Sequence, residues 1–578
     1  MTATTHGCVI GHQLANLSNV VEYLGIPYAQ PPIQKLRFMP PKPLNSTYYG
    51  KNCFNATKPA RACLTEIHRI GFIGVDEWQP NKDDMSEDCL QLNIWVPNNN
   101  TGAVIVFFFG GSYLMGSPSL PEYNGSALAH LTGSIVVNIN YRLGVLGFGR
   151  LRRGKIAPGN MGLLDQQMAL KWVHDNIRNF GGKKNMITLL GHGTGSSSAT
   201  AHMFSNVSKS YFSRVIAISG TVLNEWALED AGIVEMNFLR LMKELNCTNR
   251  NHDKEVRCMQ TKNASEIINK TETIFNPLQS VFRYPFMAVD YDGYFFEGPV
   301  EKILSTERFK KDVDILLGKT TNESTIYMHR YLRNASYGCY FYPNKSVEDK
   351  DNQCNMNEGQ YNSSVDFLVK NLNLNASAPN RIKNLYKSWP ISHRDKAIKM
   401  FADFLFDCDY LEFGKKIDPY ISQRKDKYFF VLGKRISINP WPLFFNVTSD
   451  YQSHYMFGHP FLNATAYGDN VTMEQEFSYQ YMKILSNFTY NAKLYKGYPD
   501  YSWNYWPKFN ATKTMGVFVN KTLINFDQYD ITNISTETCT RVRNIKRRFR
   551  IPRYSIRIPN ANIPDINIPE FCSILFYQ

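Results

Sequence analysis

The segment Met186-Ile-Thr-Leu-Leu-Gly-His-Gly-Thr-Gly195 decides the fold class of this 578-residue chain. An apolar run is followed at once by a glycine-rich turn and by small residues that suit the start of a helix. This order is typical of a sharp strand-to-helix turn that holds one side chain above an α/β sheet. In the G-x-S-x-G form of the turn, that side chain is a nucleophilic serine. Here the position belongs to Gly193, which has no side-chain atom to attack a carbonyl.

Apolar runs of strand length recur on both sides of this turn. Between two of them, residues 161–180 carry Leu164, Met168, Trp172 and Ile177 at helical spacing. Buried strands that alternate with helices predict the α/β class, with a large, mostly parallel central sheet flanked by helices. The expected strands are residues 104–109, 135–139, 187–190, 215–218 and 313–317.

The cysteine content and the number of glycosylation triplets indicate an extracytoplasmic protein. The chain has 11 cysteines and 21 Asn-x-Ser/Thr triplets, a combination typical of glycoproteins from an oxidising compartment. No run of about 20 uncharged apolar residues predicts a membrane span. The first residues lack the apolar segment of a signal peptide. We therefore expect a secreted or extracellular glycoprotein in its mature form or as an ectodomain.

The net charge of +14 is unevenly distributed. Residues 541–578 form a basic, Pro- and Ile-rich segment that we expect to be a C-terminal tail, and its first part contains no acid. Such a run attracts polyanions, either a glycosaminoglycan or an anionic surface, although a solvated helix end explains it equally well. Nucleic acid is not an expected partner of a secreted glycoprotein. The candidate polyanion-binding residues are Arg541, Arg543, Lys546, Arg547, Arg548, Arg550, Arg553 and Arg557.

Four further motifs occur in a fixed order around the opening segment. They are Tyr-Leu-Gly-Ile-Pro-Tyr-Ala-Gln-Pro-Pro (23–32), Ser-Glu-Asp-Cys-Leu-Gln-Leu-Asn-Ile (86–94), Asn-Tyr-Arg-Leu-Gly-Val-Leu-Gly-Phe (140–148) and Gly-Asn-Met-Gly-Leu-Leu-Asp-Gln (159–166). Together they resemble the type-B carboxylesterase and cholinesterase family over residues 5–540. The resemblance implies an α/β-hydrolase domain at residues 1–540.

Within that family, aromatic residues resemble the lining of the cholinesterase gorge. The loop Gly71-Phe-Ile-Gly-Val-Asp-Glu-Trp78 is similar to the one whose tryptophan stacks on a choline ammonium, a cation–π contact worth about 2 kcal/mol when desolvated. Packing in the core is the alternative role for these rings. His192 stands where the family has a glutamate that attracts the cation. The candidate gorge residues are Trp78, His192, Trp226, Phe282, Tyr284, Phe286 and Tyr327.

The resemblance also implies a set of disulfides. Cys63 is expected to pair with Cys89, Cys247 with Cys258, and Cys408 with Cys539, and Cys339 with Cys354 forms a plausible local loop. Cys8, Cys53 and Cys572 receive no intrachain assignment. Cys572 is the best candidate for an interchain bond.

The triad positions implied by the resemblance are degenerate. The acid survives as Glu323, but the nucleophile position is Gly193 and the histidine position is Ser449. His454 and His459 are out of register, and we expect them on the surface or in a loop. Loss of a triad nucleophile or base costs on the order of 10⁶-fold in turnover.

The oxyanion donor positions implied by the resemblance are Gly111, Ser112 and Thr194. Gly111 keeps the glycine of the family, whereas Ser112 replaces a glycine and Thr194 replaces a smaller residue. Ser196, Ser197 and Ser198 follow the turn but are expected inside the helix, without a histidine to activate them. We therefore expect no useful esterase activity.

Three functions remain in view. The first is a non-catalytic interaction protein resembling the adhesion ectodomains of the neuroligin and neurotactin type, which binds an extracellular or cell-surface protein and forms homodimers. The second is a small-ligand binder that uses the aromatic gorge without turnover. The third and most remote is a weak carboxylesterase. No metal or cofactor is expected for any of them.

Overall fold

The computed structural model describes residues 1–249, 251–274, 279–494, 506–510, 515–519, 530–533 and 537–551. Within these residues the central sheet has eleven strands in the order β18-β17-β16-β15-β14-β13-β9-β10-β8-β4-β3. The strands from β10 through β9 to β17 run parallel, and both edges are antiparallel. Their bounds are β3 (His12–Gln13), β4 (Val20–Pro27), β8 (Gln91–Pro97), β9 (Val104–Phe108), β10 (Ile135–Ile139), β13 (Ile187–His192), β14 (Arg214–Ile218), β15 (Asp314–Thr320), β16 (Lys427–Leu432), β17 (Met515–Val519) and β18 (Asp530–Asn533).

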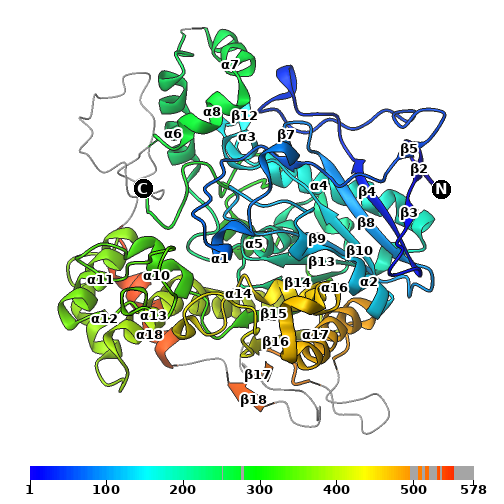
Figure 1. The fold of residues 1–578 in the computed structure, drawn as a ribbon. Helices are drawn as coiled ribbons and strands as arrows, with labels where there is room; N and C mark the ends of the chain where they lie inside the picture. The colour runs from blue at the N-terminus through cyan, green and yellow to red at the C-terminus, as the bar shows by residue number, and fades with distance from the viewer. Residues whose placement is uncertain are drawn as a thin grey trace.

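Helices cover the sheet, as Figure 1 shows. Every residue of β9, β10 and β13 is buried, which explains why these strands read as continuous apolar runs. The main covering helices are α4 (Met161–Asn176), α5 (Thr194–Ala201), α14 (Cys408–Ile417) and α17 (Val471–Asn491). The predicted large, mostly parallel sheet flanked by helices is confirmed. Across the described part of the chain, no helix is both long enough and apolar enough to cross a bilayer.

A second apolar core lies in a helical lobe beside the sheet. We define this lobe as α10 (Thr325–Tyr331), α11 (Glu358–Asn371), α12 (Ala378–Tyr386), α13 (His393–Ala402) and α18 (Glu537–Phe549). These helices gather at one corner of the molecule although α18 is more than 130 residues distant in sequence from α13 (Figure 1). Buried residues from all five helices form one cluster.

The expected tail does not begin at residue 541. Position 540 falls inside α18, and Val542 and Ile545 of that helix are buried in the lobe core. The ammonium group of Lys546, the residue after Ile545, lies 2.6 Å from a carboxylate oxygen of Asp409. The apolar residues of α18 recur at helical spacing. Their burial stabilises the docked helix, although its other face is strongly basic. Residues 541–549 therefore belong to the folded domain, and residues 552–578 lie outside the described residues.

The described residues contain five disulfides. Four are the expected pairs Cys63–Cys89, Cys247–Cys258, Cys339–Cys354 and Cys408–Cys539. The fifth joins Cys8 to Cys53, because β2 (Gly7–Ile10) pairs in parallel with β5 (Phe54–Asn55) and brings the two cysteines together. Cys572 lies outside the described residues.

Candidate functional site

Gly193 occupies the sharp turn between β13 and α5. Its backbone has φ +56° and ψ −119°, the left-handed conformation that glycine adopts at least cost. Its N–H donates a 2.9 Å hydrogen bond to the carbonyl of Ile218, which fixes the turn over the neighbouring strand. A Cβ atom added at Gly193 would have no heavy atom within 4 Å. The turn thus retains the shape and the space for a presented side chain, and lacks the side chain.

The three serines after the turn do not replace it. Ser196, Ser197 and Ser198 are all buried within α5, as expected. The Ser196 hydroxyl donates to the carbonyl of Gly220 at 2.5 Å. This hydroxyl is hydrogen-bonded to the backbone and does not take the place of a side chain held by the turn at position 193.

Glu323, at the triad acid position, is bonded to a hydroxyl and to the backbone. Its carboxylate accepts a hydrogen bond of 2.8 Å from the Ser219 hydroxyl and one of 2.6 Å from the Thr320 N–H. Gln452 donates in turn to the Ser219 oxygen at 2.7 Å. Burial raises the pKa of Glu323 to about 7, and its second oxygen, Oε2, has no hydrogen-bond partner among the described residues. The Glu323 carboxyl group is therefore held by these hydrogen bonds, and neither of them comes from an imidazole.

The two histidines near Ser449 are placed differently from our expectation. His454 is 1% exposed within α15 (Gln452–Met456), so its expected surface or loop position is wrong. Its ring lies 5.5 Å from that of Trp78, and burial lowers its pKa well below the ordinary value. His459 is half-buried and hydrogen-bonded to the Tyr467 hydroxyl at 2.8 Å. All five residues of α15 are buried, so the burial of His454 depends on how the whole helix packs and not on its periodicity.

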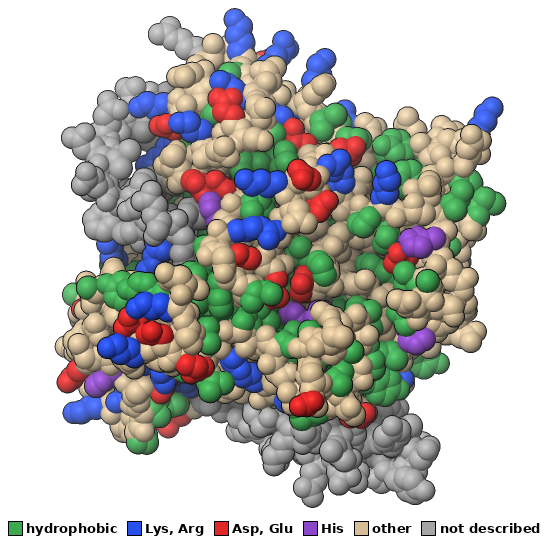
Figure 2. All heavy atoms as spheres, viewed as in Figure 1, with side chains coloured by type: hydrophobic (Ala, Val, Ile, Leu, Met, Phe, Trp, Pro, Cys, Tyr) green, Lys and Arg blue, Asp and Glu red, His purple; other side chains and the backbone are tan. Residues whose placement is uncertain are grey.

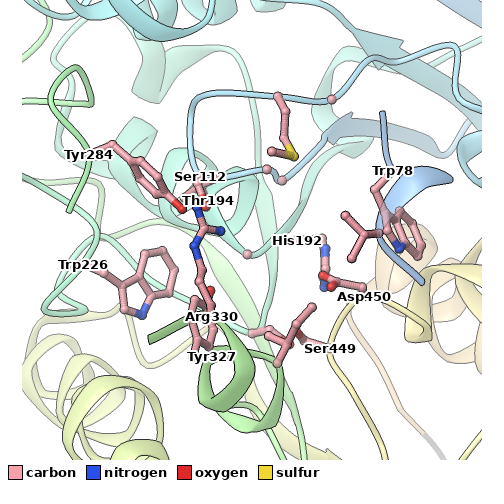
Figure 3. Close-up of a pocket in the computed structure, with 18 of the residues that line it drawn as sticks. Trp78, Ser112, His192, Thr194, Trp226, Tyr284, Tyr327, Arg330, Ser449 and Asp450 are labelled. Atoms are coloured by element: carbon pink, nitrogen blue, oxygen red, sulfur yellow. The ribbon is translucent and has the colours of Figure 1, made fainter. Parts of the chain in front are cut away.

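Above the carboxyl ends of the central strands lies a cavity of about 240 Å³ (Figure 3). Gly110, Gly193 and Ser219, which follow β9, β13 and β14, contribute to its floor, the usual place for a ligand site in an α/β sheet. The sequence-predicted residues that line it are Trp78, Gly111, Ser112, His192, Gly193, Thr194, Trp226, Phe282, Tyr284, Tyr327 and Ser449.

Phe286 is not among them, which corrects its expected gorge position. It lines a separate cavity of about 100 Å³, and its ring packs against Phe238 with 6.3 Å between ring centroids. Tyr284 borders both cavities, whereas two residues later the chain has turned away from the larger one.

Apart from histidine, three charged side chains line the larger cavity, namely Arg330, Arg333 and Asp450. Figure 3 shows Arg330 and Asp450 on different sides of it. Arg330 lies with Trp226, Tyr284 and Tyr327, and its guanidinium stands 5.0 Å from the centre of the Tyr284 ring. Asp450 lies with His192 and Trp78 on the other side.

Burial sets the charge of Asp450 and His192, which both line the cavity on the side of Trp78. It raises the pKa of Asp450 to about 6, so that this carboxyl group is mostly ionised at neutral pH. It lowers the pKa of His192 to about 4, although a hydrogen bond to the Ser449 backbone opposes the shift. His192 is therefore neutral, and Asp450 supplies the negative charge at this end of the cavity.

Sequence reasoning overlooked Arg330 and Asp450. Arg330 follows Tyr327 by three residues on α10, so helical spacing places it on the same face. Asp450 directly follows Ser449 in the sequence. Both positions were open to prediction once their neighbours had been assigned to the cavity.

Several polar atoms of the cavity wall lack a hydrogen-bond partner among the described residues. They include the indole nitrogens of Trp78 and Trp226, Nε2 of His192 and the hydroxyl of Thr194. Buried polar groups are costly unless they bond to something. These atoms are thus available to a bound ligand or to water.

In the oxyanion loop, residues 109–113, neighbouring residues have positive φ angles. Ser112 has φ +60° and Gly111 has φ +115°. A Cβ atom at Gly111 would lie 2.2 Å from the Met115 carbonyl oxygen, so only glycine fits there. The serine at position 112 adds a strained, polar residue to the cavity wall.

The candidate polyanion residues are largely engaged with acids. Arg541 bonds to Glu537, Arg543 to Glu412, Lys546 to Asp409 and Arg550 to Glu225. Arg547 and Arg548 are exposed, and Arg553 and Arg557 lie outside the described residues. Figure 2 shows basic and acidic side chains interspersed over the visible face of the helical lobe.

The strand order, the Gly193 turn and the cavity at the strand ends define an α/β-hydrolase fold. A family model described as "Carboxylesterase family" matches residues 1–530, and the chain belongs to that family. It is 33% identical over 509 residues to a cholinesterase of Mus musculus, covering 87% of this chain and 80% of the mouse protein. It is 31% identical over 528 residues to an acetylcholinesterase of Bungarus fasciatus, covering 90% and 82% of the two chains.

Proposed function

We propose that this chain is a non-hydrolytic, extracellular binding protein of the carboxylesterase family. The arrangement around Glu323 carries the proposal. The acid is bonded to Ser219 and to the Thr320 N–H, while the nucleophile and histidine positions hold Gly193 and Ser449. Acyl transfer in this fold needs a nucleophile and a base within hydrogen-bond reach of each other. Neither group is present at these positions.

The cavity favours a small molecule as the bound partner. It combines aromatic walls with polar atoms that have no hydrogen-bond partner among the described residues, and a cation, Arg330, and a carboxyl group, Asp450, lie on different sides of it. Ligand pockets are typically apolar clefts with a few placed polar groups. A ligand that matches both ends is zwitterionic, with its cationic group over Trp78 and beside Asp450 and its anionic group at Arg330.

Titration of tryptophan fluorescence tests this assignment. The probes are phosphocholine as a zwitterion, tetramethylammonium as a cation and inorganic phosphate as an anion. We expect phosphocholine to bind most tightly. Replacement of one charged partner, Arg330→Gln or Asp450→Asn, should weaken its binding at least tenfold, since charge-assisted hydrogen bonds contribute about 1.5–3 kcal/mol. Absence of any fluorescence change at millimolar probe concentrations would contradict a ligand role for the cavity.

A surface partner is the second candidate, supported by exposed apolar residues near the aromatic cluster of Trp441. Ile73 is 62% exposed and Leu443 is 68% exposed, on two segments that meet where Phe72 packs on Trp441 at 4.8 Å. Exposed apolar patches are typical of interaction surfaces, and the Phe72–Trp441 contact brings the two segments together. Cross-linking at cell surfaces with wild type and with an Ile73→Ser, Leu443→Ser variant tests this candidate. Equal capture by both proteins would contradict a partner site there.

A further inference from the structure

We propose that Glu66, His68 and Glu272 form a binding site for a divalent transition-metal ion of the zinc type. The three residues come from two distant segments of the chain. Glu66 and His68 lie in the loop closed by the Cys63–Cys89 disulfide, and Glu272 caps the C-terminus of α8 (Ala264–Thr271). One ligand atom from each residue lies within 4.8 Å of the other two.

The spacing of these atoms fits tetrahedral coordination with little movement. Nε2 of His68 is 2.6 Å from a Glu272 oxygen and 3.5 Å from a Glu66 oxygen. Bonds of about 2.0–2.2 Å in a tetrahedral zinc site place ligand atoms about 3.4 Å apart. The Glu66 contact already has that separation, and the Glu272 contact needs to open by less than about 1 Å.

The chemistry of the three groups selects the class of ion. An imidazole nitrogen with two carboxylates suits zinc and its neighbours, whereas calcium and magnesium prefer all-oxygen ligand sets. The two carboxylates both approach one imidazole and lie within 4.8 Å of each other, so they repel each other. A dication between them would offset this repulsion better than a singly protonated histidine.

A buried glutamine positions the histidine. The Gln79 side chain accepts a hydrogen bond of 2.6 Å from the backbone N–H of His68 and donates one of 3.0 Å to the backbone carbonyl of His68. Gln79 is 3% exposed, so this clamp is screened from water. The backbone of His68 is therefore fixed before any ion binds, which lowers the entropy cost of assembling the site.

The site borders both cavities. Glu66, His68 and Glu272 line the smaller one, and His68 also lines the larger one. A bound ion would tie the loop that carries Trp78 to α8. Its remaining coordination position would be open to water or to a ligand from the cavity, as in zinc sites with three protein ligands.

The test uses the full-length protein after dialysis against a chelator. Isothermal titration with Zn²⁺, together with metal analysis after desalting, should give one ion per chain. His68→Asn and Glu272→Gln should each weaken binding at least tenfold. His12→Asn is the matched control, because His12 pairs with Glu22 at 2.8 Å without belonging to such a three-residue cluster. This control should bind Zn²⁺ as wild type does.

A second readout needs no variant. Co²⁺ bound at the site should give the intense visible absorption of tetrahedral cobalt, and stoichiometric Zn²⁺ should remove it. The proposal is overturned if wild type binds neither ion stoichiometrically. It is equally overturned if folded His68→Asn and Glu272→Gln variants bind Zn²⁺ with unchanged affinity, because the ion would then be held elsewhere.

Discussion

The Ser219 hydroxyl donates a 2.8 Å hydrogen bond to the carboxylate of Glu323, the acid that an esterase of this fold directs at its histidine. Gln452 supports Ser219 from the other side at 2.7 Å. Among the described residues, Oε1 of Glu323 thus accepts hydrogen bonds from a hydroxyl and from the Thr320 N–H, and none from an imidazole. Burial determines how this carboxyl group responds to pH.

Replacement of Glu323 by glutamine should reduce the pH dependence of stability. Burial raises the pKa of Glu323 from 4.5 to about 7, so between these values the native state binds more protons than the unfolded chain. Stability from this group is therefore fully present below about pH 4.5 and is lost as the pH rises through 7, by up to about 3 kcal/mol. Thermal unfolding at pH 5 and pH 8 should show a smaller loss for Glu323→Gln than for wild type. An equal loss would contradict this assignment.

Restoring the two missing triad residues should restore covalent reactivity. The turn has space for a side chain at Gly193, and φ of +56° is the strained conformation that the nucleophile adopts in this fold. A Gly193→Ser, Ser449→His protein should react with a fluorophosphonate at least a hundredfold faster than wild type. Gly193→Ala with Ser449→His is the control, since it carries the same backbone strain without the oxygen. Equal labelling of the two variants would show that the reagent attacks another residue.

The docking of α18 should depend on Glu225. Burial alone would raise the pKa of Glu225, but the cations of Arg283, Arg550 and Lys546 lower it to about 2. A lowered carboxyl pKa stabilises the native state above the unfolded value near 4.5, and the contribution disappears as the pH falls toward 2. Glu225→Gln should destabilise the protein by about 3 kcal/mol at pH 7, whereas Arg547→Gln on the exposed face of α18 should have no effect. Hydrogen exchange of α18 amides in both variants measures the difference.

Heparin affinity should be modest and should depend on exposed residues of α18. Three of its basic side chains, and Arg550 directly after it, are paired with acids, which leaves the exposed Arg547 and Arg548 as the strongest candidates among the described residues. Because α18 is part of the domain, deletion from residue 541 would damage the fold, and substitution is the cleaner test. Arg547→Gln with Arg548→Gln should elute from heparin at lower salt than wild type. Unchanged elution would contradict a polyanion role for this helix.

The sequence predicted what depends on local pattern and missed what depends on distant packing. The turn at Gly193 and the buried parallel strands follow from short apolar runs and glycine spacing. The Cys8–Cys53 bond was not predicted, because it depends on the pairing of β2 with β5. For α18, the buried Val542 and Ile545 were a signal at helical spacing that the surrounding arginines obscured. Phe286 and His454 were misplaced because the direction of each side chain depends on the element that carries it.

The most direct test of the central claim is ester hydrolysis by the purified wild-type protein. Acetylthiocholine and p-nitrophenyl esters should show no turnover above the uncatalysed rate, because Gly193 offers no nucleophile and Ser449 no base. Intact-mass analysis after treatment with an organophosphate should show no adduct on any residue that lines the cavity. Saturable hydrolysis that the same organophosphate abolishes would contradict the account.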